Sequence, residues 1–168
     1  MKRQVAGVLL CAVVLSGGAI SARAQASSSD KAAIETAYKQ FAEAFTKKDV
    51  KGIMVFFAPD AFVYDVIPPR EYASAAAYKK DWEGLFATLP GAVKAKVADV
   101  NITVAGTVAY THYIVDATMT DKDGKPIHTV VRSTDVWRKT SGKWLIVQEH
   151  NSCPVDLTTG QADLLSKP

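Results

Sequence analysis

The chain has 168 residues, of which 20 are Lys or Arg and 17 are Asp or Glu, so its formal net charge is +3. Hydrophobic residues make up 48% of it, which is enough for a globular core and too much for a disordered chain. Neither this charge nor any basic run favours a nucleic acid or an anionic membrane as a partner.

The first 26 residues have the pattern of a secretory signal peptide. Lys2 and Arg3 precede an apolar run over 5–15, and cleavage sites of the Ala-x-Ala type follow. The apolar run is too short to span a membrane. Lipoprotein processing at Cys11 fits less well because bulky Leu10 precedes it, and an amphipathic helix would need a polar face. We therefore expect an exported protein, periplasmic or secreted, whose mature form has no integral membrane segment.

Loss of this leader changes the charge and the cysteine content. It removes Lys2, Arg3 and Arg23 but no acidic residue, which leaves 17 basic and 17 acidic residues. The basicity therefore belongs to the leader. Cys153 becomes the only cysteine, so no internal disulfide can form. We interpret it as a half-buried small side chain, with an intermolecular disulfide as the alternative.

The first half of the mature chain predicts three helices. Candidate N-cap residues at 27–30 precede a helix whose apolar residues recur at the helical period: Ile34, Tyr38, Phe41 and Phe45. A second, short helix is expected over 50–57, before Pro59. After a strand at 61–65, a third helix runs from about 74 to 87, with an apolar stripe of Tyr78, Trp82, Leu85 and Phe86.

The second half changes to the period of two that is typical of strands. Four strands are expected, over 93–104, 108–119, 127–138 and 144–151. Helices followed by a meander of strands indicate an α+β fold whose sheet buries one face on the helices. We assign the folded domain to 27–158 and treat 159–168 as a C-terminal tail that frays.

Two motifs carry a resemblance to a known family. They are Phe57-Ala58-Pro59-Asp60-Ala61…Tyr64-Asp65 and Trp144-x-Ile146-x-x-x-His150-x-Ser152-x-Pro154. With the order of the elements, they resemble the SnoaL-like family of the NTF2-like superfamily, over roughly Asp30 to Val155. The resemblance implies an NTF2-like cone, in which three N-terminal helices pack on a strongly curved antiparallel sheet around a pocket. Relatives include ketosteroid isomerases, polyketide cyclases, dehydratases and a kinase association domain, and others only bind or assemble.

The register of the strands predicts which residues face the pocket. A two-residue turn at Asp123-Gly124 would place His112 opposite Asp135, on one face with Tyr110 and Ser133. The resemblance to the SnoaL-like family implies that the same alternate residues face the pocket. The candidate ligand-binding residues are Tyr64, Tyr110, Ser133, Glu149, Asn151 and Trp82.

The resemblance also implies catalytic roles. Asp65 occupies the place of an isomerase-like general base, Asp135 that of a protonated acid in an oxyanion hole, and His112 could donate beside it or pair with Asp65. Carboxyl groups in a poorly solvated cavity acquire different pKa values, so one can act as base and another as acid. Asp65 would then move a proton on a carbon beside a carbonyl, while Asp135 or His112 donates to the enolate oxygen.

Other features weigh against these roles. Phe41 stands where an isomerase-like enzyme has a tyrosine, and the arginine trio of the kinase association domain is absent. Asp135 could instead be a structural carboxylate bonded to a neighbouring strand or to Arg132, and His112 a core histidine. No His-x-His, Cys-x-x-Cys, His-Glu-x-x-His, phosphate-loop or Gly-x-Ser-x-Gly pattern occurs, so we expect no metal or redox cofactor.

The sequence thus supports two functional hypotheses. The first is an exported protein that binds a small apolar or carbonyl-containing ligand, with acid–base chemistry of the isomerase, cyclase or dehydratase type. The alternative is a non-catalytic oligomerisation or ligand-binding module. The resemblance further implies a homodimer formed through the outer face of the sheet, where parity would place Trp144, Ile146, Gln148 and His150.

Overall fold

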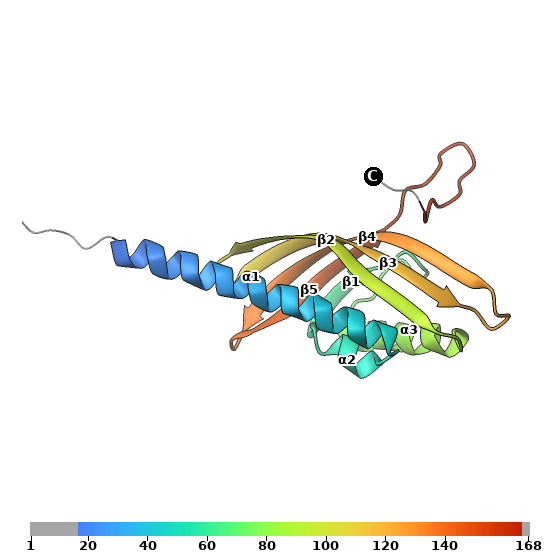
Figure 1. The fold of residues 1–168 in the computed structure, drawn as a ribbon, viewed down its shortest axis with the longest axis horizontal. Coiled ribbons are helices and arrows are strands. Elements are labelled where there is room, and N and C mark those ends of the chain that lie inside the picture. Colours follow the sequence, from blue (N-terminus) through green and yellow to red (C-terminus); the bar gives the residue numbers. More distant parts are fainter. Residues whose placement is uncertain (1–16, 166–168) are drawn as a thin grey trace, which may run out of the picture.

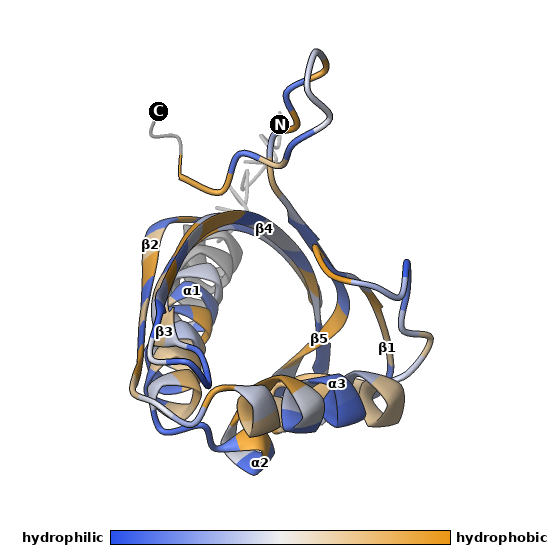
Figure 2. Ribbon diagram, turned by 90° about the vertical axis from the view of Figure 1, so that its right-hand side faces the viewer, coloured by the Kyte–Doolittle hydropathy of each residue, from blue (hydrophilic) through white to orange (hydrophobic). Residues whose placement is uncertain are grey.

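The computed structural model describes residues 17–165, with side chains described from residue 27 onward. It confirms the α+β fold, with helices against a strongly curved sheet (Figures 1 and 2). The elements are α1 Gly17–Thr46, α2 Val50–Met54, β1 Phe57–Tyr64, α3 Ala75–Thr88, β2 Val93–Ala105, β3 Val108–Thr120, β4 Pro126–Thr140 and β5 Lys143–Ser152. The predicted signal peptide lies outside the described residues, except for the backbone of 17–26. Within residues 17–165, no helix is long and apolar enough to cross a membrane.

The predicted sheet is antiparallel throughout, whereas the observed sheet has one pair of neighbouring strands that is parallel. Its order is β1-β5-β4-β3-β2, and every neighbouring pair is antiparallel except β1 and β5, which are parallel. Parallel neighbours need a long connection, and here α3 and the whole β2–β4 meander separate the two strands. β1 is therefore added at the edge of the meander rather than by a hairpin.

The apolar stripe of α1 is buried against the sheet, as its spacing predicts. The stripe residues Ile34, Tyr38, Phe41 and Phe45 are each at most 9% exposed. The predicted N-cap at 27–30 is wrong, because α1 runs through these positions. Asp30 instead accepts hydrogen bonds from Lys139 Nζ at 2.6 Å and from Trp144 Nε1 at 3.0 Å. It joins α1 to the end of the β4–β5 hairpin.

The two shorter helices begin at side-chain caps. Asp49 accepts from the backbone N–H of Gly52 at the start of α2, and Ser74 caps α3. α2 ends at Met54, earlier than predicted, because the chain enters β1 at Phe57. Pro59 lies inside β1, where the pairing with β5 is irregular. A proline has no N–H for the ladder, so an irregular edge strand tolerates it.

The turn between β3 and β4 is longer than the two residues predicted. Thr120 pairs with Pro126, and the intervening loop is closed by Asp121, whose Oδ1 accepts the backbone N–H groups of Asp123 and Lys125. The register therefore shifts by one residue from the predicted one. Because side chains alternate between the faces of a sheet, every β3 side chain lies on the face opposite to that expected.

β5 contains a bulge that the sequence pattern did not reveal. Val136 pairs with Gln148, but the next residue, Trp137, pairs with Ile146, so Val147 is unpaired. On β5, the inward-facing residues are odd-numbered after the bulge, as at Glu149, and even-numbered before it. Trp144 and Ile146 are therefore buried in the core, at 8% and 2% exposure, and their predicted place on the outer face is wrong.

Candidate functional site

A cavity of about 250 Å³ lies between α1, α3 and the concave face of the sheet. At roughly 30 Å³ per water molecule in the liquid, this is the room of about eight waters. Its walls are mostly apolar, and five aromatic rings contribute to them: Phe41, Phe45, Tyr78, Trp82 and Tyr113. Figure 2 shows α1 and α3 on the side toward which the sheet curves.

Five of the predicted site residues meet in the wall of this cavity. They are Asp65, Trp82, Ser133, Glu149 and Asn151. No Lys, Arg or His lies among the described residues that line it. The cavity therefore offers carboxyl, amide and hydroxyl groups on an apolar background, with no fixed positive charge.

Asp65 directly follows β1 and is half-buried at the cavity wall. Its Oδ1 accepts a hydrogen bond from the backbone N–H of Val66 at 2.6 Å. Burial raises the pKa of the Asp65 carboxyl above its usual value, while the bond from Val66 and interactions with Tyr78 and Asn151 oppose the rise. Among the described residues, no hydrogen bond ties Asp65 to the proline-rich loop at 67–70.

Glu149 projects inward from β5 and is only 3% exposed. Its Oε1 accepts from the Tyr78 hydroxyl at 2.8 Å and from Asn151 Nδ2 at 2.9 Å, and the amide of Asn151 is in turn oriented by Ser133 Oγ at 2.6 Å. Burial raises the pKa of Glu149 well above its usual value, and the carboxyl groups of Asp135 and Asp65 raise it further. This environment favours the protonated carboxyl.

Asp135 lies behind Glu149 rather than in the cavity wall. The two residues are direct partners on β4 and β5, and Asp135 is fully buried. Its Oδ2 accepts from the Tyr38 hydroxyl at 2.7 Å, whereas its Oδ1 has no partner among the described residues. Burial raises the pKa of Asp135 to about 7, although the hydroxyls of Tyr38 and Tyr113 oppose the rise.

A polar network holds Asp135 in place from α1 and β3. The Tyr38 hydroxyl is also hydrogen-bonded to Thr111 Oγ1, and Trp137 Nε1 donates to both oxygens at 3.2 Å. The structural alternative for Asp135 was a bond to a neighbouring strand or to Arg132. Its first form agrees with the interaction with Tyr113 on the neighbouring β3, whereas Arg132 is not among the observed partners. Asp135 therefore supports Glu149 from within the core, and its predicted position as a group that faces the ligand is not observed.

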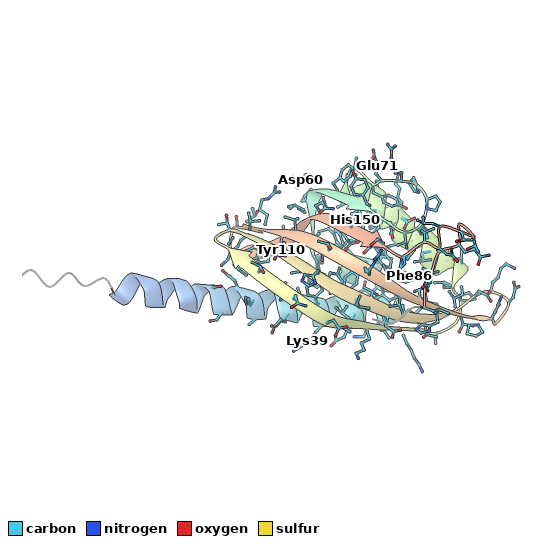
Figure 3. The ribbon with its side chains drawn as sticks, turned by 90° about the horizontal axis from the view of Figure 1, so that it is seen from above. Lys39, Asp60, Glu71, Phe86, Tyr110 and His150 are labelled. Carbon is cyan, nitrogen blue, oxygen red and sulfur yellow. The ribbon has the colours of Figure 1, made fainter. Side chains whose placement is uncertain are left out.

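Three predicted site residues lie on the outer face of the sheet, so their predicted place in the pocket is wrong. His112 is exposed and pairs with Thr134, because of the one-residue register shift. The same shift leaves Tyr110 51% exposed. Tyr64 is 40% exposed because it follows the inward-facing Val63 on β1. Figure 3 looks onto this face and labels Tyr110 there.

Sequence reasoning missed the role of the tyrosines. It treated Tyr38 and Tyr78 as core or pocket wall, yet their hydroxyls hold Asp135 and Glu149. A signal was available, since tyrosine rather than phenylalanine at a buried helix position needs a hydrogen-bond partner. It also missed Ala162 and Leu164 of the expected tail, which line the cavity.

This arrangement can support proton transfer without a metal ion. Asp65, half-buried and hydrogen-bonded, can act as a base, and Glu149, buried beside other carboxyl groups, can act as an acid. Within the described part of the chain, no group of three or more His, Cys, Asp or Glu side chains is placed to hold a metal ion.

Comparisons with known proteins agree with this fold. A family model described as "SnoaL-like domain" matches residues 34–156. An NTF2-like protein of unknown function from Pseudomonas putida KT2440 is 25% identical, over 86% of this chain and 98% of that one, with a TM-score of 0.75. An NTF2-like superfamily protein from Salmonella enterica serovar Typhimurium LT2 is 21% identical, over 81% and 99%, with a TM-score of 0.70.

A more distant structure carries a functional description. A ketosteroid isomerase-like protein from Erwinia carotovora atroseptica SCRI1043 is 17% identical, over 71% of this chain and 92% of that one, with a TM-score of 0.62. At this identity the likeness concerns the fold alone. A comparison with curated proteins finds no match.

Proposed function

This chain belongs to the SnoaL-like domain family, and we propose that it binds a small, uncharged, largely apolar carbonyl compound and moves a proton on it. The observation that carries the proposal is that Asp65 and Glu149 line one apolar cavity whose described walls contain no cationic side chain. A carboxylate ligand would meet carboxyl groups without a compensating charge, whereas a ketone would meet a carboxyl group that can donate.

The proton transfer would use the two carboxyl groups in different states. Ionised Asp65 removes a proton from the carbon beside the carbonyl, the C–H electron pair forms the carbon–carbon double bond, and the negative charge moves to oxygen. Protonated Glu149 donates a hydrogen bond to that oxygen and stabilises the enolate. Return of the proton from Asp65 to a carbon of the enolate gives the isomer and restores both groups.

The positions of the other polar groups support this division of roles. The hydrogen bonds from Tyr78 and Asn151 to Glu149 both end on Oε1, which leaves Oε2 to carry the proton toward a ligand. Asp135 behind it disfavours ionisation of Glu149, so the acid stays protonated. Phe41, in the cavity wall, supplies no second donor to the enolate oxygen.

Proton exchange on a simple ketone tests the proposal without the natural substrate. Butyrophenone is incubated with the protein in D₂O, and NMR follows the loss of the signal of the protons beside the carbonyl. We expect the wild type to exchange these protons faster than buffer alone and Asp65→Asn to exchange them no faster than buffer. Glu149→Gln should lower the exchange rate by about a hundredfold, the usual effect of losing one oxyanion donor. Glu83→Gln, an exposed residue paired with Lys79 on α3, is the matched control and should exchange like the wild type.

The alternative is a non-catalytic ligand-binding or oligomerisation module. A ligand-binding module predicts that butyrophenone binds but that neither the wild type nor any variant accelerates exchange, whereas an oligomerisation module predicts neither binding nor exchange. Isothermal calorimetry on the same samples separates the two outcomes. Absence of both binding and exchange would reject a ligand-binding role for the cavity.

We also propose a homodimer formed through the outer face of the sheet. This face carries aromatic side chains in edge-to-face contact, with ring centroids 5.0 Å apart for Phe62 and Tyr64 and 5.7 Å apart for Tyr64 and His150. Tyr110 is exposed on the same face, on β3. Exposed aromatic groups are typical of interface cores. Sedimentation that finds only monomer across the micromolar range would contradict the dimer.

Export remains a proposal that rests on residues 1–26. We expect the mature chain to begin near Gln25 or Ser27 and to be recovered from the periplasm or the medium. N-terminal sequencing decides this, because intact Met1 on cytoplasmic protein would contradict cleavage.

A further inference from the structure

The C-terminal segment 153–165 is an ordered part of the cavity rather than a tail. It leaves β5 at Cys153-Pro154, where proline cannot continue the ladder. It turns at Asp156–Gly160, where Asp156 Oδ1 accepts the backbone N–H of Thr158 at 2.8 Å and Gly160 has a φ of 71°. The returning strand bonds to the outgoing one at Val155 and Ala162. Figures 1 and 2 show this segment projecting from the sheet above β4.

One backbone hydrogen bond attaches the returning strand to the sheet. β5 pairs with β4 only as far as Ser152 and Arg132, so the edge of β4 before this point has no strand beside it. There the N–H of Val130 donates to the carbonyl of Leu164 at 2.7 Å. The bond gives a partner to the Val130 N–H, which would otherwise be unpaired at the free edge of β4, and it fixes Leu164 against the sheet.

This attachment makes Leu164 a boundary between the cavity and solvent. The Leu164 side chain is half-buried and lines the cavity, as does the exposed Ala162 beside it. By contrast, Leu157 at the turn is 95% exposed and is not part of the cavity wall. Leu157 and Leu164 therefore differ in whether a ligand can meet them.

We propose that Leu164 is a specificity-determining residue, which closes the outer end of the cavity and sets the longest ligand it accepts. The proposal rests on the ligand-binding role given above. Ligand carbons that fit behind Leu164 leave water, and each buried methylene should raise affinity by about fourfold. Carbons beyond this limit must displace Leu164 and break its bond to Val130, so affinity stops rising.

A homologous series of phenyl alkyl ketones, from acetophenone to dodecanophenone, measures this limit by calorimetry on the full mature chain. In the wild type we expect affinity to rise with chain length and then to level off. Leu164→Ala should move the levelling-off point to ketones longer by about two to three carbons, the size of the group removed. Leu164→Phe should move it to shorter ketones. Leu157→Ala is the matched control and should keep the wild-type limit.

The outcomes separate this inference from the proposed function. If the ketones bind but both Leu164 variants keep the wild-type limit, Leu164 does not set ligand length, and the proposed binding function stands. If Leu157→Ala shifts the limit as far as Leu164→Ala, the effect belongs to the stability of the segment and the inference is overturned. If no ketone binds the wild type, the proposed function and this inference both fail. Circular dichroism verifies that each variant is folded.

Discussion

Replacement of Asp135 by Asn should change how stability depends on pH. Asp135 is fully buried, and its pKa rises from 3.8 to about 7 because burial disfavours the charged form. The folded protein therefore keeps a proton that the unfolded chain has already lost. The stability that this group contributes is full below about pH 4 and is lost as the pH rises toward 7.

The magnitude follows from the shift. At about 1.4 kcal/mol for each pKa unit, three units correspond to about 4 kcal/mol of unfolding free energy lost between pH 4 and 7. Asn carries no charge, so the variant should lose this part of the slope. Asn also keeps the acceptor for Tyr38 but places an amide where Oδ1 has no partner, at a cost of about 1–3 kcal/mol. The variant should therefore be less stable than the wild type at pH 4.5 and more stable at pH 7.5, by about 1–3 kcal/mol.

Urea unfolding followed by tryptophan fluorescence at several pH values from 4.5 to 7.5 measures this crossing. Asp60→Asn is the control, since Arg138 lowers the pKa of the exposed Asp60, which is ionised in both states throughout this range. Its slope should equal that of the wild type. An unchanged slope in Asp135→Asn, or a wild-type stability that rises from pH 4.5 to 7.5, would refute the reasoning.

Three further predictions concern single side chains. Asp65→Asn should leave stability at pH 7.5 unchanged or raised, because burial already disfavours the charge, and a loss of about 1–3 kcal/mol in urea unfolding would show that Asp65 is structural instead. Tyr38→Phe should lower stability by about 1–3 kcal/mol and extend the loss of stability with pH to higher pH, since the hydroxyl opposes the raised pKa of Asp135. Exposed Tyr110→Phe should do neither. Alkylation of Cys153 by iodoacetamide should slow when butyrophenone saturates the cavity that Cys153 lines, and an unchanged rate, followed by mass spectrometry, would contradict this placement.

Periodicity in the sequence was enough to predict most helices and strands, and part of the candidate site. Helical spacing identified the buried face of α1, and the period of two identified the strands. The inward parity of Ser133, Asp135, Glu149 and Asn151 on β4 and β5 was also predictable, because these residues lie on one side of the bulge at Val147. Local periodicity suffices where no irregularity intervenes.

Only the tertiary structure decided which residues of β3 face the cavity and what closes it. Asp121 closes a longer loop than its sequence suggests, and the resulting one-residue shift in register turned His112 and Tyr110 outward. Apolar side chains such as Ile114 and Val115 occur at both parities of β3, so its alternation alone does not select the inward face. Likewise, 159–168 was predicted to be a tail that frays, whereas the free edge of β4 at Val130 supplies a hydrogen-bond partner for Leu164 and brings its side chain to the cavity.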